Sequence, residues 1–115
     1  MTPEELKSKT LDELYALRRD MNSTEWQIAL EGASADDRRK AAEGLLDIQQ
    51  TILALENARL AVIRDRLIEN EGALAEGIAG LSRARQRLSQ AKDVIEAAGA
   101  LISTAAKVVK VAGGV

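Results

Sequence analysis

The sequence lacks cysteine, histidine and phenylalanine, and among its 115 residues it has one proline, one tryptophan and one tyrosine. Without cysteine it can form neither a disulfide nor a thiolate nucleophile, so cysteine usage says nothing about the redox compartment. Without histidine it lacks the side chain that most often acts as a general base in enzymes. The single proline, Pro3, stands at the beginning, so no residue of this kind interrupts a helix later in the chain.

An excess of charge of one sign is also missing. The 16 lysines and arginines are opposed by 18 aspartates and glutamates, which gives a net charge of −2. Nucleic-acid binders owe much of their affinity to basic residues that neutralise phosphates, so nucleic acid is not expected as a partner. The first ten residues are polar and lack the layout of a signal peptide. No uncharged apolar run reaches the roughly 18 residues of a spanning helix, and we expect a cytoplasmic protein, with association with a membrane as the alternative.

The sequence does have a row of large aliphatic residues at every seventh position. The row comprises Leu46, Leu53, Leu60, Leu67, Leu74, Leu81, Leu88, Ile95, Ile102 and Val109. Alanines form a second row three positions farther along: Ala84, Ala91, Ala98, Ala105 and Ala112. A spacing of seven corresponds to two turns of an α-helix, whereas a strand alternates with a period of two. The pattern predicts a helix with a continuous apolar edge, and the alanines would let a partner helix approach closely.

The first helix is predicted over residues 3–31. Thr2 is a good N-cap, and Pro3 suits the first turn because its missing N–H would have no partner there. Gly32 is predicted to end this helix in the left-handed conformation. Its apolar stripe comprises Leu14, Leu17, Met21 and Ile28, with Trp26 and Leu30 beside it.

The second helix is predicted over residues 35–111, after a short loop at 32–34. Ser34 can cap it, and a loop this short implies that the two helices pack antiparallel as a hairpin. The residues expected to face the first helix are Leu45, Leu46, Ile48, Ile52, Leu53, Leu55, Val62 and Ile63. The first helix is too short to cover the second beyond about residue 65. The rest of the row would therefore need another partner.

A weak point in the long helix lies at residues 70–80, where Asn70-Glu71-Gly72 is followed by two more glycines. A turn at 70–72 would convert the hairpin into a three-helix bundle, and this is the alternative fold. Two observations favour the unbroken helix. The aliphatic row stays in phase from Leu67 to Leu74, and Ala73-Leu74-Ala75 offers no cap for a new helix.

No pattern of residues predicts catalysis, a cofactor or a metal, so the protein is not expected to be an enzyme. Glu43 and Asp47 would share a helical face, but no Glu-x-x-His pair accompanies them as in di-metal bundles. The glycines at 72, 77 and 80 are not preceded by a strand, as a phosphate-binding loop requires. Arg83, Arg85 and Arg87 are interpreted as part of a solvated basic face.

The C-terminal segment, residues 94–115, carries only three charges, Glu96, Lys107 and Lys110. A helix that is apolar around most of its circumference must be covered by several neighbours or by lipid. The segment therefore suggests two alternatives, the core of an oligomer or a cationic helix that lies on a membrane. The residues expected to contact a membrane are Leu101, Ile102, Lys107, Val108, Lys110 and Val111.

The sequence thus predicts an all-α single domain built as a helical hairpin with one very long, coiled-coil-like helix. The function expected is that of a non-enzymatic assembly or adaptor subunit, which forms a homo-oligomer or binds partner helices. A membrane-active protein is the alternative, and no small-molecule substrate is expected. The predicted partner seam comprises Leu67, Leu74, Leu81, Ala84, Leu88, Ala91, Ile95, Ala98, Ile102, Ala105 and Val109.

Overall fold

The computed structural model describes the backbone of residues 1–113 and the side chains of residues 1–109. Within this range the chain forms six helices and no strand, which confirms the all-α prediction. The helices are α1 (Pro3–Asp20), α2 (Thr24–Glu31), α3 (Ala35–Asn57), α4 (Leu60–Glu69), α5 (Glu71–Arg85) and α6 (Ala91–Gly113).

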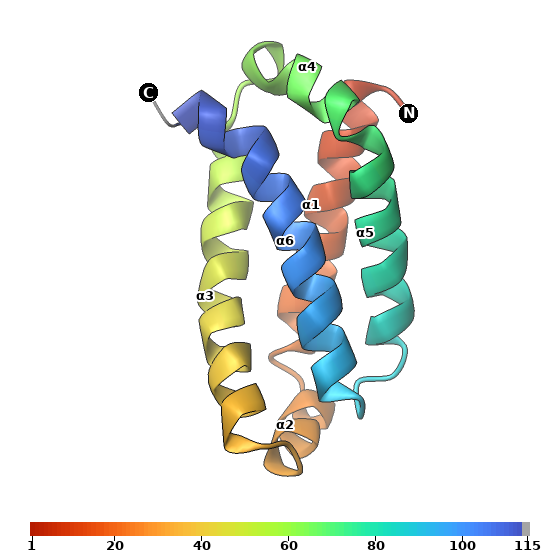
Figure 1. Ribbon diagram of the computed structural model, residues 1–115, viewed down its shortest axis with the longest axis vertical. Helices are drawn as coiled ribbons and strands as arrows, with labels where there is room; N and C mark the ends of the chain where they lie inside the picture. The colour runs from red at the N-terminus through yellow and green to blue at the C-terminus, as the bar shows by residue number, and fades with distance from the viewer. Residues whose placement is uncertain (114–115) are drawn as a thin grey trace.

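The four longer helices, α1, α3, α5 and α6, form a bundle, and the short helices α2 and α4 lie across its opposite ends (Figure 1). Each long helix packs against two others, so that α1 and α6 both contact α3 and α5. The hairpin partners α1 and α3 are antiparallel, as are α5 and α6, whereas α3 and α6 run side by side in the same direction. The molecule is elongated, with extents of 44 × 27 × 18 Å.

The prediction of one very long helix over residues 35–111 is therefore wrong. The chain leaves the helical path at residues 58–59, at residue 70 and at residues 86–90. The alternative, a three-helix bundle with a turn at 70–72, places one of these three breaks correctly. It misses the other two, and the result is a four-helix bundle.

The break between α3 and α4 follows from burial rather than from a helix-breaking residue. Ala58 and Arg59 take extended conformations, with ψ of 128° and 129°. Lys7 of α1 donates a hydrogen bond to the Ala58 carbonyl at 2.8 Å, which satisfies a group that the ended helix leaves free. The bend lays α4 across the end of the bundle, where Ile63 and Leu67 are almost completely buried.

The junction between α4 and α5 is the single residue Asn70, with φ of −104° and ψ of 12°. Its side-chain amide donates to the Arg66 carbonyl at 2.8 Å and so helps to end α4. No side chain caps α5, and its first backbone bond runs from the Leu74 amide to the Asn70 carbonyl. The absence of a cap after residue 72 was therefore no obstacle to a new helix.

The predicted first helix, residues 3–31, is also divided. It ends after Asp20, because Asn22 and Ser23 satisfy backbone carbonyls with their side chains: Asn22 donates to Arg18 at 2.9 Å and Ser23 donates to Asp20 at 2.6 Å. Ser23 also accepts from the Trp26 amide and caps α2. The division turns Trp26 inward and leaves Ile28 exposed, contrary to the predicted stripe.

Gly32 also differs from its prediction, because it is not left-handed. Its φ is −86°, a conformation that any residue adopts. The helix that follows starts as its sequence suggests, since the Ser34 hydroxyl accepts a hydrogen bond from the Asp37 amide and caps α3.

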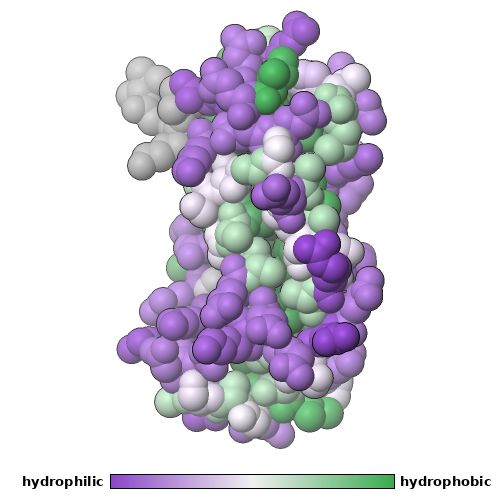
Figure 2. Space-filling model, turned by 45° about the vertical axis from the view of Figure 1, so that its right-hand side comes forward, coloured by the Kyte–Doolittle hydropathy of each residue, from purple (hydrophilic) through white to green (hydrophobic). Residues whose placement is uncertain are grey.

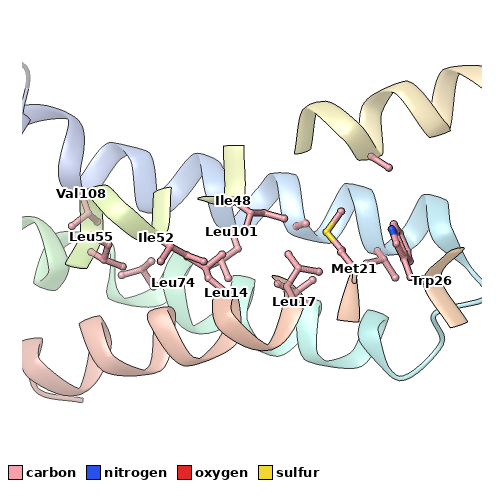
Figure 3. Close-up of a cluster of buried hydrophobic side chains, with 14 of the residues drawn as sticks. Leu14, Leu17, Met21, Trp26, Ile48, Ile52, Leu55, Leu74, Leu101 and Val108 are labelled. Carbon is pink, nitrogen blue, oxygen red and sulfur yellow. The ribbon is translucent and has the colours of Figure 1, made fainter. Parts of the chain in front are cut away.

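The core is a line of aliphatic side chains along the axis of the bundle, with Met21 and Trp26 at one end (Figure 3). Four members of the seven-residue row are buried in this core, and four more pack against it partly buried: the first are Leu67, Leu74, Leu81 and Leu88, and the second are Leu60, Ile95, Ile102 and Val109. Leu46 and Leu53 were expected to face the first helix, but their side chains are 55% and 60% exposed. The row is therefore regular in sequence, but its members do not all face the core. Each break between helices changes which helical face packs against the rest of the bundle.

Arg85 does not lie on a solvated basic face as predicted, but joins α5 to α1. Its guanidinium donates to Glu13 at 2.6 and 3.2 Å and to Asp20 at 2.8 Å. These hydrogen bonds, the one to Glu13 first, raise the pKa of Arg85 above its ordinary value. Other charged side chains remain outside, and Figure 2 shows hydrophilic residues flanking a paler central band on one face of the bundle.

Candidate functional site

A groove of about 380 Å³ lies between the parallel helices α3 and α6, next to α2. Its apolar lining comes from Met21, Trp26, Ala41, Ile48, Val94, Ile95, Ala98 and Ile102, and its other lining residues are Lys40, Glu43, Gly44, Asp47, Gly99 and Ser103. It extends over residues 94–103 of α6, a length of about 14 Å along the helix axis. We consider this groove the candidate functional site.

A glycine in each wall keeps the groove open. Gly44 lies within α3 and Gly99 within α6, and a Cβ atom added to either would meet no atom within 4 Å. Each glycine inside a helix costs about 1 kcal/mol relative to alanine. Packing within the monomer does not require a glycine at these two positions, in contrast to Gly77. A Cβ there would lie 3.1 Å from Leu101 Cδ1 and 3.4 Å from Leu101 Cα.

The α3 edge of the groove carries charged residues, some of which form salt bridges within the molecule while others do not. Lys40 pairs with Asp36 at 3.2 Å, and Arg39 contacts the same carboxylate. The hydrogen bond from Lys40, followed by its charge and that of Arg39, lowers the pKa of Asp36. Glu43 and Asp47 also line the groove, and neither makes a salt bridge with another described residue. The edge is therefore apolar within and acidic at its lip, which we define as Glu43 and Asp47.

Trp26 closes the end of the groove near α2. Its side chain is 1% exposed and packs beside Met21 (Figure 3). Among the described residues no side-chain nitrogen or oxygen is both fully buried and without a hydrogen-bond partner, and this includes the indole nitrogen of Trp26. Trp26 therefore contributes an apolar ring to the end of the groove without leaving a buried polar atom unsatisfied.

The predicted partner seam is divided between the core and this groove. The structure buries Leu67, Leu74, Leu81, Leu88, Ala91 and Ala105 inside the bundle and leaves Ala84 and Val109 partly exposed. Ile95, Ala98 and Ile102 line the groove, and Ile95 and Ile102 are only partly buried. The part of the seam that a partner can reach directly is therefore the stretch along α6.

The residues predicted to contact a membrane are also divided by the bundle. Leu101 and Val108 are buried in the core, Ile102 lines the groove, and Lys107 is exposed. The side chains of Lys110 and Val111 lie outside the described residues. A search of the described helices finds none that is long and apolar enough to span a membrane.

A second hollow, of about 690 Å³, lies between α5 and α6. Arg83 and Arg87 come from the α5 side, and Asp93 and Glu96 come from α6. Charges of both signs therefore face this hollow, and it offers no continuous apolar surface. Among the described residues no group of three or more carboxylates is placed to hold a metal ion.

Sequence reasoning did not identify the groove. In the sequence, Glu43 and Asp47 stand out only as a possible metal-binding pair, and the glycines at 72, 77 and 80 stand out more than Gly44 and Gly99. A usable signal was present, because a glycine inside each of two strongly helical segments is unfavourable without a local reason. That the two glycines share one groove depends on α3 and α6 lying side by side, which the predicted long helix excluded.

Comparisons with protein-family models, with curated proteins and with solved structures find no match for this chain. The geometry of the groove is therefore the basis for a functional proposal.

Proposed function

We propose that the protein is a non-enzymatic helical adaptor that binds an apolar helix of a partner, flanked by basic residues, in the groove between α3 and α6. The observation that carries the proposal is the pair of glycines that face open space in the two walls. Filling that space would favour the isolated monomer, since alanine is the better helix former. A mostly apolar groove that the monomer itself forms is typical of a binding site.

A helix is the occupant that fits the shape of the groove. Two parallel helices form a straight channel, and a third helix can lie in it with its side chains between theirs. Small residues in the walls, Ala41 and Gly44 on α3 and Ala98 and Gly99 on α6, allow a close approach. The length of about 14 Å would accommodate two to three turns of the partner.

The charges at the lip indicate which helix would be preferred. Glu43 and Asp47 have no basic partner within the described chain, so lysine or arginine beside the apolar face of the occupant would complement them. Electrostatic complementarity of this kind contributes mainly to specificity and to the association rate. A helix with acidic flanks should bind more weakly.

The proposal can be tested with a synthetic amphipathic peptide that has leucine and alanine on one face and lysine at its borders. Trp26 is the only tryptophan of the protein and lines the groove, so its fluorescence reports occupancy directly. We expect a saturable change in emission and heat of binding by calorimetry. A peptide in which glutamate replaces each lysine should bind at least several-fold more weakly.

Variants that fill the groove provide the decisive comparison. Gly44→Leu and Gly99→Leu should abolish peptide binding while the protein stays folded, because leucine favours the helix and space is available. Ala42→Leu and Ala100→Leu are the matched controls, since both alanines are exposed on the same helices outside the groove. The proposal is wrong if the fluorescence does not respond to millimolar peptide, or if the groove variants bind as well as the controls.

A further inference from the structure

We infer that the occupant of the groove is the C-terminal part of α6 from a second copy of this chain, so that the protein associates head to tail. We call residues 107–113 the tail. This inference rests on the proposed function, because it names the partner of the same groove. It requires that the tail match the groove chemically and that its own groove be out of reach.

The chemistry of the tail matches the groove. After Glu96 the sequence contains no acidic residue, and its only charges are Lys107 and Lys110. Between and after these lysines stand valine, alanine and glycine. An apolar helix with two lysines is what an apolar groove with the acidic lip Glu43 and Asp47 would select. Lys107 is exposed and available for such a contact.

The geometry excludes binding of the tail to its own groove. The groove lies near α2, whereas α6 ends at the opposite end of the bundle, near α4 (Figure 1). The helix that carries the tail also forms one wall of the groove, and Val108 is held in the core at 1% exposure. A tail can therefore enter only the groove of another molecule, and Lys107 is the described tail residue that is exposed for this contact.

Groove and tail lie on different surfaces of the same molecule, so the contact is heterologous. A pair of molecules then still has one free groove and one free tail, and association continues unless the rotation closes a ring. The inference thus predicts assemblies that grow with protein concentration rather than a dimer of fixed size.

Two complementary variants test this directly. Gly44→Leu blocks the groove and leaves the tail unchanged. Lys107→Glu with Lys110→Glu reverses the charge of the tail and leaves the groove unchanged. In light scattering at several concentrations the unmodified protein should form growing assemblies, and each variant alone should associate about tenfold more weakly or not at all. Their equimolar mixture should form dimers only, since a single functional groove meets a single functional tail.

A charge exchange and a matched control complete the experiment. Glu43→Lys with Asp47→Lys, combined with the charge-reversed tail, should restore growing assemblies. The control Ala42→Leu should assemble like the unmodified protein. Circular dichroism verifies that each variant is folded. The inference is overturned if the unmodified protein remains a monomer, or if the blocked and reversed variants assemble normally. If the synthetic peptide still binds in a Gly44-dependent manner while the protein is monomeric, the proposed function stands and only the partner is wrong.

Discussion

At the scale of single residues, the glycines inside helices differ in what surrounds them. Gly44 and Gly99 face open space, and we predict that Gly44→Ala and Gly99→Ala each raise the free energy of unfolding by about 1 kcal/mol. Gly77→Ala should raise the free energy of unfolding by less than the other two substitutions, or should lower it. Leu101 is fully buried, and its Cα cannot move away from the added Cβ. Urea unfolding of the three variants measures the order. Equal effects at all three positions would contradict the proposed packing of α5 against α6.

The single tyrosine provides a second test at the same scale. Tyr15 donates to Glu56 Oε2 at 2.6 Å, and this hydrogen bond is the main reason why the pKa of Tyr15 is raised. The protonated phenol therefore favours the folded state, fully so below the unfolded pKa of about 10, and the contribution disappears as the pH rises through the folded pKa.

Because no other tyrosine contributes, phenolate absorbance reports Tyr15 alone. We predict a higher titration midpoint in native protein than in protein unfolded by urea. The Glu56→Ala variant should remove most of this difference. Identical midpoints for native and unfolded protein would show that the contact between α1 and α3 is absent in solution.

At the scale of elements, Arg85 fastens α5 to α1 by contacts with two carboxylates. Glu13 is 9% exposed in its side chain, so Arg85→Met would leave a nearly buried carboxylate without a partner. Breaking a fully buried pair costs about 3–5 kcal/mol, and the partial exposure of Arg85 reduces our expectation to about 2 kcal/mol. Thermal unfolding gives the value.

Two further variants separate this ion pair from a general effect of charge. Arg83→Met removes an exposed arginine of the same helix and should change stability by no more than about 0.5 kcal/mol. Glu13→Leu combined with Arg85→Met should recover part of the loss, because no buried carboxylate then remains unpaired. A loss as large in Arg83→Met as in Arg85→Met would refute the assignment.

Some helix ends are determined by neighbouring residues in the sequence, and others are determined by contacts with distant helices. Thr2 and Ser34 cap α1 and α3 through their own hydroxyls, and both caps were readable from sequence. The ends at Ala58 and Asn70 involve no proline and no left-handed glycine. They depend on contacts with other helices, such as the hydrogen bond from Lys7, and no local pattern predicts such contacts.

At the scale of the whole molecule, α6 completes the core rather than projecting from it. Val94, Leu101 and Val108 are each no more than 1% exposed, and α6 packs on α3 and α5 together. Fully burying one such side chain stabilises a protein by about 1.5–3 kcal/mol, so several of them amount to much of an ordinary domain's stability.

Truncation after Gln90 should therefore abolish cooperative unfolding. Truncation after Val109 retains every one of these buried residues and should unfold cooperatively at nearly the temperature of the full chain. Circular dichroism on heating distinguishes the two outcomes. A stable, cooperative fragment ending at Gln90 would instead mean that the first five helices form a domain of their own.

The sequence by itself determined that the protein is helical, because the apolar residues recur at helical spacing and capping residues stand at two helix starts. It also contained the small and acidic residues of the groove, although they lie far apart along the chain. Only the tertiary structure decided where the chain turns and which faces meet. Ending a helix at Ala58 or Asn70 loses a few backbone hydrogen bonds. Burial of Ile63, Leu67 and Leu74 in the core offsets this loss. That gain comes from contacts between distant segments, so neither the turns nor the groove between α3 and α6 could be derived from local patterns.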